Sequence, residues 1–270
     1  MIYRLGSIQR FLMTLDSSKI YVYLPLIRKM SNFVIDNKVK VKDKVDMIQS
    51  LTDIEIATKI VEEVKDSNED LHETYYKKLN CNLRHIESEE KVYSVLEEYL
   101  TNSSSDNSYQ KIEIMQAFEI EKLNDKEKFV DYGNRKLLWH GSRITNYVGI
   151  LSQGLRIAPP EAPVSGYLFG KGVYFADMAS KSACYCYPSN NVAIILLCEV
   201  SLGNPRELNT TDCNAAILPS GCHSTKANGK TIPSKEIDLG DGVKIPLGAP
   251  TTSNSDVRII FHFILDLPRL

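Results

Sequence analysis

Two short stretches hold the residues that could do chemistry in this chain. The first is "HGS", His140 to Ser142, which directly follows the apolar run "KLLW" and the chain's only tryptophan. The second, "SGYLFGKGVYFADMASKSACY", Ser165 to Tyr185, combines three glycines with five aromatic rings. Glycine lets a ligand approach main-chain N–H and C=O groups, and flat rings offer surfaces for stacking. These stretches therefore favour a site for a planar, aromatic ligand.

The polar groups in the same stretches suit a ring that carries a carboxamide, such as nicotinamide. Gly141 offers a backbone N–H and C=O, and a hydroxyl such as that of Ser182 could complete the contact with an amide. Each feature alone also has an ordinary structural explanation, because strand ends often carry a satisfied histidine and glycine-aromatic loops are often hairpin turns. The chain has no GxGxxG, P-loop or HExxH motif, so a doubly wound dinucleotide fold is not expected.

The elements that must position these residues change in character along the chain. Up to about residue 100 the apolar residues recur at three- and four-residue steps, as in "VKDKVDMIQSLTDIEIATKIVEE" and "ESEEKVYSVLEEYL", where Ser88 is the expected N-cap. The polar run "TNSSSDNS", Thr101 to Ser108, is the expected linker. Later segments are short and rich in β-branched and aromatic residues: "YQKIEIMQAFEIE", "KLLWH", "GVYFA", "VAIILLCEV" and "VRIIFHFIL". We expect an α+β protein with a helical N-terminal segment and a mixed, largely antiparallel sheet.

The composition excludes several classes of partner. The formal net charge of −2 gives no basic field for nucleic acid, so we expect contact with nucleic acid only through separate domains. The longest apolar run, "VAIILL", has the length of a strand, so no membrane association is expected. The six cysteines form no C-x-x-C pair and are expected to be reduced thiols. A metal site of Cys184, Cys186, Cys222 and His223 fits no zinc spacing, so no metal is expected.

The stretch from Leu137 to Cys186, "LLWHGSRITNYVGILSQGLRIAPPEAPVSGYLFGKGVYFADMASKSACYC", closely resembles the catalytic domain of poly(ADP-ribose) polymerases, especially their DNA-dependent nuclear members. Upstream, "KVDMIQSLTDIEIATKIVEE" and "YYKKLNCNLRHIESEE" resemble the family's helical regulatory domain. The resemblance implies an incomplete regulatory domain over residues 1–105. It also implies an ADP-ribosyltransferase domain, shortened at its C-terminus, over residues 106–270.

The resemblance also implies a reaction and a role for individual residues. NAD would be the substrate, ADP-ribose would be transferred to protein acceptors with release of nicotinamide, and the protein would be nuclear. The transition state would have oxocarbenium character, which demands orientation and electrostatic stabilisation more than a strong base. Catalytic roles would fall on His140, Tyr174 and Lys181. NAD would be bound by His140, Gly141, Ser142, Gly149, Arg156, Tyr174, Ser182 and Tyr185.

The chain departs from the family at the strand that carries a glutamate in the pattern "YNEYIVY". If "RIIFHFILD" is that strand, the glutamate position falls on Phe261 or Ile260, and no glutamate follows Glu236. We therefore expect transfer of single units or loss of activity in place of chain elongation. The family's last strands also lack a counterpart, so an unpaired sheet edge is expected. The alternatives are an inactive module that binds NAD or ADP-ribose and acts through partners, and a hydrolase that releases free ADP-ribose.

Overall fold

The computed structural model describes most of the chain from residue 70 onward and parts of the segment before it. The described residues are 7–16, 44, 47–48, 51, 54–60, 62, 70–104, 112–122, 129–157, 167–253 and 262–265. Within them no helix is long and apolar enough to cross a membrane.

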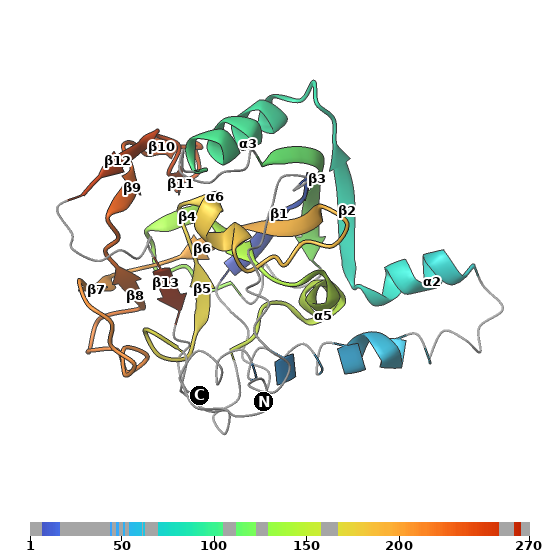
Figure 1. Cartoon of the computed structure of the whole chain (residues 1–270), viewed down its shortest axis with the longest axis horizontal. Helices are drawn as coiled ribbons and strands as arrows, with labels where there is room; N and C mark the ends of the chain where they lie inside the picture. The colour runs from blue at the N-terminus through green and yellow to red at the C-terminus, as the bar shows by residue number, and fades with distance from the viewer. Residues whose placement is uncertain are drawn as a thin grey trace, which may run out of the picture.

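Two sheets form the body of the protein (Figure 1). The larger sheet has seven strands, in the order β10 (Ile237–Asp238), β11 (Val243–Ile245), β4 (Arg135–Gly141), β6 (Val192–Ser201), β1 (Ser7–Asp16), β3 (Glu113–Lys122) and β2 (Cys81–Ile86). The smaller sheet has four strands, in the order β5 (Val173–Phe175), β13 (His262–Leu265), β8 (Ser224–Ala227) and β7 (Pro205–Leu208). A separate pair joins β12 (Pro250–Thr252) to β9 (Thr231–Pro233).

Most strand pairs are antiparallel, which confirms the predicted α+β class with a largely antiparallel sheet. The parallel exceptions among the described strands are β11 with β4 and β7 with β8. The described helices are α2 (Leu71–Lys78), α3 (Lys91–Asn102), η1 (Ile144–Asn146), α5 (Tyr147–Gln153) and α6 (Ala179–Ala183).

Alternation along β4 and β6 builds a hydrophobic core on each face of the large sheet. Leu138 and Leu196 join a cluster that includes Tyr147 and Ile150 of α5. The side chains next to these in each strand belong to a second cluster on the opposite face, together with three residues of α3. Its members include Leu137, Trp139, Ile195, Leu197, Leu96, Tyr99 and Leu100. Successive side chains of a strand point to opposite faces, so the continuous apolar run of β6 is the expected pattern for a strand covered on both sides. Helices α3 and α5 therefore lie on opposite faces of the sheet (Figure 1).

The first 105 residues are not helical throughout, in contrast to the expectation for this segment. β1 lies inside the large sheet, where it pairs antiparallel with β6 on one side and with β3 on the other. The helical pattern of "LHETYYKKLNCNLRHI" also ends early, because α2 is followed by β2 after Asn80, whose φ of 54° reverses the chain. Because β1 pairs with both neighbours, β6 and β3 are interior strands of the sheet, and the expected unpaired edge stays a prediction.

Part of the predicted N-terminal helix is described, and it is exposed. Residues 54–60 are helical, and the side chains of Ile48, Leu51 and Ile54 are 60, 56 and 42% exposed. The expected apolar positions Val45 and Val61 lie outside the described residues. Figure 1 shows α2 extending away from the two sheets. The boundary expected after residue 105 falls in 105–111, which also lies outside the described part.

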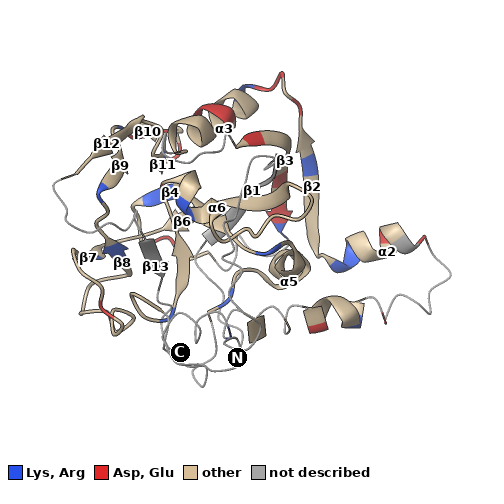
Figure 2. Ribbon diagram, in the orientation of Figure 1, with Lys and Arg blue, Asp and Glu red and all other residues tan. Residues whose placement is uncertain are grey.

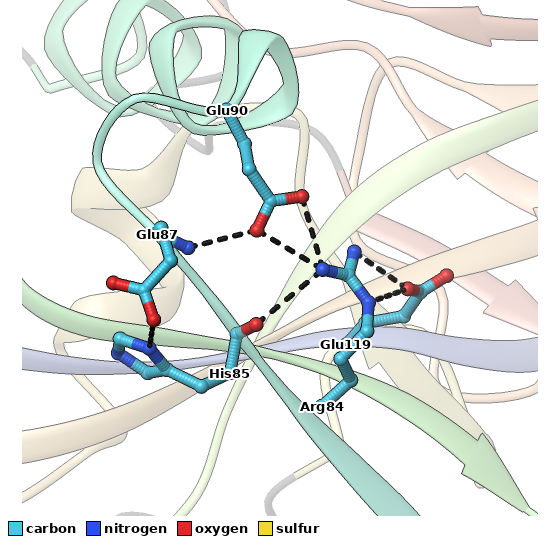
Figure 3. A network of polar contacts seen from close by, with 5 residues as sticks. All are labelled: Arg84, His85, Glu87, Glu90 and Glu119. Carbon is cyan, nitrogen blue, oxygen red and sulfur yellow. Dashed lines mark hydrogen bonds and ion pairs between the residues drawn. The ribbon is translucent and has the colours of Figure 1, made fainter.

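Charged residues hold the start of α3 against the sheet (Figure 3). Arg84 of β2 contacts Glu119 of β3 at 2.9 Å and Glu90 at 2.9 Å, and the Glu90 carboxylate also accepts from the Glu87 backbone N–H at 2.9 Å. These bonds lower the pKa of Glu90, the backbone contact having the larger effect. The predicted N-cap Ser88 was wrong: the cap residue is Glu90, and the Ser88 hydroxyl bonds Glu89. Charged residues also occur along other described elements, as the coloured ribbon of Figure 2 shows.

One carboxyl group is buried between β5 and α6. Asp177 is 6% exposed, and its Oδ1 has no hydrogen-bond partner among the described residues. Burial raises its pKa to about 7, against the opposing effects of its own backbone N–H and of Lys136 and Lys226, while Glu236 raises it further. A neutral carboxyl is therefore favoured in the folded protein below neutral pH.

This burial predicts a loss of stability with rising pH that Asp177→Asn removes. A raised pKa in the folded state stabilises the protein most below the unfolded pKa and loses that contribution as pH rises through about 7. Between pH 5 and pH 8, the free energy of unfolding of the variant should gain about 3 kcal/mol relative to wild type. Urea denaturation at several pH values measures this, with the exposed Asp238→Asn as control. A difference that stays constant over this range would contradict the prediction.

Candidate functional site

β4 and α6 come into very close contact at Gly141. A Cβ atom on Gly141 would lie 1.9 Å from the carbonyl oxygen of Ser182 and 3.0 Å from Sγ of Cys186. No side chain fits at such distances, so the approach of two backbone segments requires glycine here. The sequence reasoning assigned the missing side chain to making room for a ligand. In the structure the backbone of Ser182 fills that space.

The edge of β4 that faces β5 is bridged by Ala176, the residue directly after β5. The N–H of Trp139 donates to the Ala176 oxygen at 2.7 Å, and the Ala176 N–H donates to the Trp139 oxygen at 2.9 Å. Alternate residues of an antiparallel strand turn their N–H and C=O to the same edge, so Gly141 faces this edge as Trp139 does. Because the bridge is isolated among the described residues, Gly141 presents a donor and an acceptor beyond the point where β5 pairs with β4.

The imidazole of His140 is oriented by the same pair of strands. Its Nδ1 lies 2.9 Å from the backbone oxygen of Tyr174 in β5. Because a carbonyl only accepts, Nδ1 must carry the proton, which leaves Nε2 as an acceptor in the neutral ring. Burial lowers the pKa of His140, and the bond to Tyr174 opposes this in part. The structure thus favours a neutral histidine with a defined tautomer.

The hydroxyl of Ser182 lies next to the bridge. Ser182 is buried in α6, and its Oγ donates to the Trp139 oxygen at 2.9 Å. With its hydrogen directed at Trp139, this hydroxyl retains lone pairs that can accept a further bond. Ser182 therefore lies against Gly141 through its backbone and bonds Trp139 through its hydroxyl.

Aromatic residues lie on β5, in the loop before it and directly after α6. The Tyr174 hydroxyl donates to the Gly170 oxygen, and the rings of Tyr174 and Tyr167 stack with centroids 6.2 Å apart. Nζ of Lys181 in α6 lies 5.4 Å from the centroid of the ring of Tyr185, which follows the helix, in reach of a cation–π contact. Burial lowers the pKa of Lys181. The structure thus links His140 to Tyr174, Gly141 to Ser182, and Lys181 to Tyr185.

The predicted residues of the adenosine side lie on the segment that follows β4. The Ser142 hydroxyl, just before η1, accepts at 3.0 Å from Nδ2 of Asn146, the last residue of that helix. Gly149 is buried within α5, and Arg156 follows that helix, where it bonds Gln153 at 2.9 Å. Their participation in ligand binding stays a prediction.

The strand expected to carry the family glutamate lies beside β5. β13 pairs antiparallel with β5, so that Ile264 lies opposite Tyr174. The two positions considered for the glutamate, Ile260 and Phe261, fall outside the described residues.

The cysteines considered for a metal take part in other contacts. Cys186 is buried and its Sγ lies 3.6 Å from the Ser182 oxygen, whereas Cys184 is exposed. His223 accepts from the Asn204 N–H at 3.1 Å and stacks on Tyr132. All six cysteines are free thiols, and the described part of the chain has no group of three His, Cys, Asp or Glu residues placed to hold a metal ion.

The sequence reasoning missed one residue that contacts both sides of the site. Tyr99 of α3 is fully buried, and its hydroxyl donates to the backbone oxygens of Leu137 at 3.1 Å and Asp177 at 3.2 Å. The helical spacing of apolar residues predicts that Tyr99 faces the core, but it does not identify the acceptors of its hydroxyl.

Comparisons with known proteins match most of the chain. The model of the poly(ADP-ribose) polymerase catalytic domain matches residues 88–260, and the model of the regulatory domain of the same family matches residues 9–77. Poly [ADP-ribose] polymerase 2 of Arabidopsis thaliana is 46% identical over 91% of the chain and 40% of its own length. The Homo sapiens poly [ADP-ribose] polymerase 2 is 45% identical over 80% of the chain and 38% of its own length.

A poly [ADP-ribose] polymerase 1 is similar to the chain at a comparable level of identity. Poly [ADP-ribose] polymerase 1 of Xenopus laevis is 41% identical over 85% of the chain, which corresponds to 24% of the relative's length. The chain thus spans well under half the length of these relatives. Because the catalytic-domain match alone covers more than half of its 270 residues, the chain belongs to the poly(ADP-ribose) polymerase family.

Proposed function

We propose that the chain is an NAD-dependent ADP-ribosyltransferase that modifies protein acceptors and releases nicotinamide. Membership of the family supports the class of reaction. The observation that carries the proposal is the position of Gly141, whose backbone donor and acceptor lie beyond the last bridge between β4 and β5 and next to the Ser182 hydroxyl. A carboxamide needs one donor and one acceptor side by side, and Gly141 offers both.

The hydrogen-bonding groups of the nicotinamide end can be matched one by one. The Gly141 N–H would donate to the amide oxygen of the ligand, and the Gly141 C=O would accept from the amide nitrogen. Ser182 would add a third contact, either by accepting the second amide hydrogen or by turning its own hydrogen from Trp139 to the ligand. The ring of Tyr185 would stack on the pyridine ring, and Tyr174 would line the same site.

The remaining groups suit a reaction that breaks the bond between nicotinamide and ribose. Nε2 of a neutral His140 would accept from a ribose hydroxyl and hold the sugar in place. Nicotinamide leaves as a neutral ring while positive charge grows on the ribose, so orientation of the sugar lowers the barrier. Lys181 would lie near the reacting ribose, with its charge directed toward the Tyr185 ring. Ser142, Gly149 and Arg156 would contact the adenosine half.

We propose transfer of single units in place of polymer synthesis, because the two positions considered for the family glutamate, Ile260 and Phe261, are apolar in the sequence. An apolar side chain at the glutamate position cannot polarise an acceptor hydroxyl. Nuclear residence and an indirect relation to DNA through separate domains rest on the family resemblance alone. NAD is a substrate in this proposal, and no metal is required.

The apolar residues at these two positions also favour a second candidate, an inactive module that binds NAD or ADP-ribose. Incubation of the protein and candidate acceptors with NAD labelled in the adenylate part distinguishes the two. Label on protein supports the transferase, whereas saturable binding without label supports the module. Release of free ADP-ribose without protein label would indicate the hydrolase. A protein that neither binds nor consumes NAD would contradict all three.

The proposed site predicts that His140→Ala weakens binding of ligands that contain the ribose but does not change binding of benzamide alone. The histidine would contact the ribose, so the variant should bind benzamide as wild type does but bind benzamide adenine dinucleotide about tenfold more weakly, as expected for one lost hydrogen bond. Isothermal titration calorimetry measures both ligands. His85→Ala, at an exposed position of β2, is the control. An equal loss for both ligands would place His140 outside the ribose subsite.

The close contact at Gly141 predicts that Gly141→Ala loses both stability and benzamide binding. The added Cβ would lie 1.9 Å from the Ser182 oxygen, so β4 and α6 must separate, at a cost of about 1–3 kcal/mol in the free energy of unfolding. Denaturation and calorimetry measure the two effects. Gly221→Ala is the matched control, because a Cβ there meets nothing within 4 Å while φ of +82° still strains alanine. Wild-type affinity in Gly141→Ala would contradict the proposed binding mode.

A further inference from the structure

The hydroxyl of Tyr99 connects the two backbone segments that carry the proposed nicotinamide contacts. One acceptor, the oxygen of Leu137, lies on β4 four residues before Gly141. The other, the oxygen of Asp177, lies between β5 and α6, five residues before Ser182. Tyr99 is 0% exposed, so its hydroxyl works where water does not compete for these acceptors.

The contact with Leu137 lies on the same edge of β4 as Gly141. Residues 137, 139 and 141 turn their backbone groups to one edge, because alternate residues of a strand share a direction. Along this edge, the Tyr99 hydroxyl bonds Leu137 and Ala176 pairs with Trp139. Gly141 is the next residue of β4 that faces the same edge. Tyr99 thus holds β4 against the β5–α6 segment on one side of the bridge, and the proposed ligand position lies on the other side.

Further contacts run from α3 to the same segments. The Ser180 N–H donates to the Ser103 oxygen at the end of α3, at 3.2 Å. The Tyr99 ring packs on the Trp139 ring with centroids 4.7 Å apart, and the Trp139 oxygen accepts from Ser182. A continuous series of contacts therefore leads from Tyr99 through Trp139 to Ser182.

Helix α3 is itself fixed at both ends. The bonds of Arg84 and Glu87 to Glu90 hold its start (Figure 3). At its end, Nδ2 of Asn102 donates to the Leu247 oxygen at 2.8 Å, 145 residues along the chain. Because both ends of the helix are bonded, the Tyr99 hydroxyl has a fixed position, and it fixes the positions of the two backbone segments that it bonds.

We propose that Tyr99 is a positioning residue for the nicotinamide end of the site: its hydroxyl sets the spacing between Gly141 and Ser182 from the side opposite to the ligand. The inference rests on the proposed function for its consequence in binding. It adds a residue of α3, remote in sequence from both motifs, to those that determine affinity for the carboxamide.

The test compares Tyr99→Phe with Tyr93→Phe, which removes a hydroxyl from a half-buried tyrosine of the same helix. Hydrogen exchange of the ligand-free proteins should be about five- to tenfold faster in segments 137–141 and 176–186 of Tyr99→Phe, and unchanged there in Tyr93→Phe, as the loss of one buried hydrogen bond implies. Benzamide affinity, measured by calorimetry well below the unfolding temperature, should fall by a similar factor in Tyr99→Phe alone.

A purely structural role would give a different result. Tyr99→Phe would then unfold at a lower temperature, yet its exchange would rise across the whole domain and its benzamide affinity would match wild type. That pattern, or unchanged exchange in both segments, would overturn the inference. If wild type does not bind benzamide, the proposed function fails, and the exchange of the ligand-free proteins still decides whether Tyr99 holds the two segments together.

Discussion

The contact between β4 and α6 at Gly141 is the constraint on which the site depends. It brings the Ser182 oxygen into the space where any other residue would place a Cβ atom, and it lets the Ser182 hydroxyl reach the Trp139 oxygen. It lies two residues along β4 from the isolated bridge between Trp139 and Ala176. Both the open backbone groups of Gly141 and the nearby hydroxyl follow from this one contact.

The groups around that contact form a site with few charges. Burial favours the neutral form of His140, the bond of Nδ1 to Tyr174 fixes its tautomer, and the Tyr185 ring lies within reach of the Lys181 cation. Backbone amides, hydroxyls and rings supply the remaining contacts. Such groups can bind a neutral carboxamide and orient a sugar without moving protons, which suits a reaction whose leaving group departs uncharged.

The fold class could be predicted from the sequence because its signals are local, and the residues around the bridge lie in equally short stretches of the sequence. The apolar runs of β4 and β6, the glycines beside aromatic rings and the family motif all lie within short windows. The contacts of His140 with Tyr174 and of Gly141 with Ser182 agree with the grouping that the motif implied. Whether these residues bind NAD is a property of the complex, which neither pattern nor fold tests.

Features that depend on distant partners were not predictable in the same way. Residues Ser7–Asp16 mix apolar and polar side chains without a distinct period, so their place in the sheet is determined by β3 and β6. The cap at Glu90 depends on Arg84 of β2, and the role of Tyr99 depends on two carbonyls 38 and 78 residues away. Helical periodicity reports which side chains are buried, but not which polar atoms they meet there.

The interior position of β1 has a consequence for how the chain is made. Ser7 pairs with Val200 and Asp16 with Val192, so one partner of this strand is separated from it by most of the chain. At ribosomal rates of about 5–20 residues per second, the segment waits on the order of ten seconds or more before that partner exists. Closing so long a loop is slow, so we expect the central sheet to assemble late, after synthesis has passed β6. During that interval a chaperone could shield the early strand from neighbouring nascent chains.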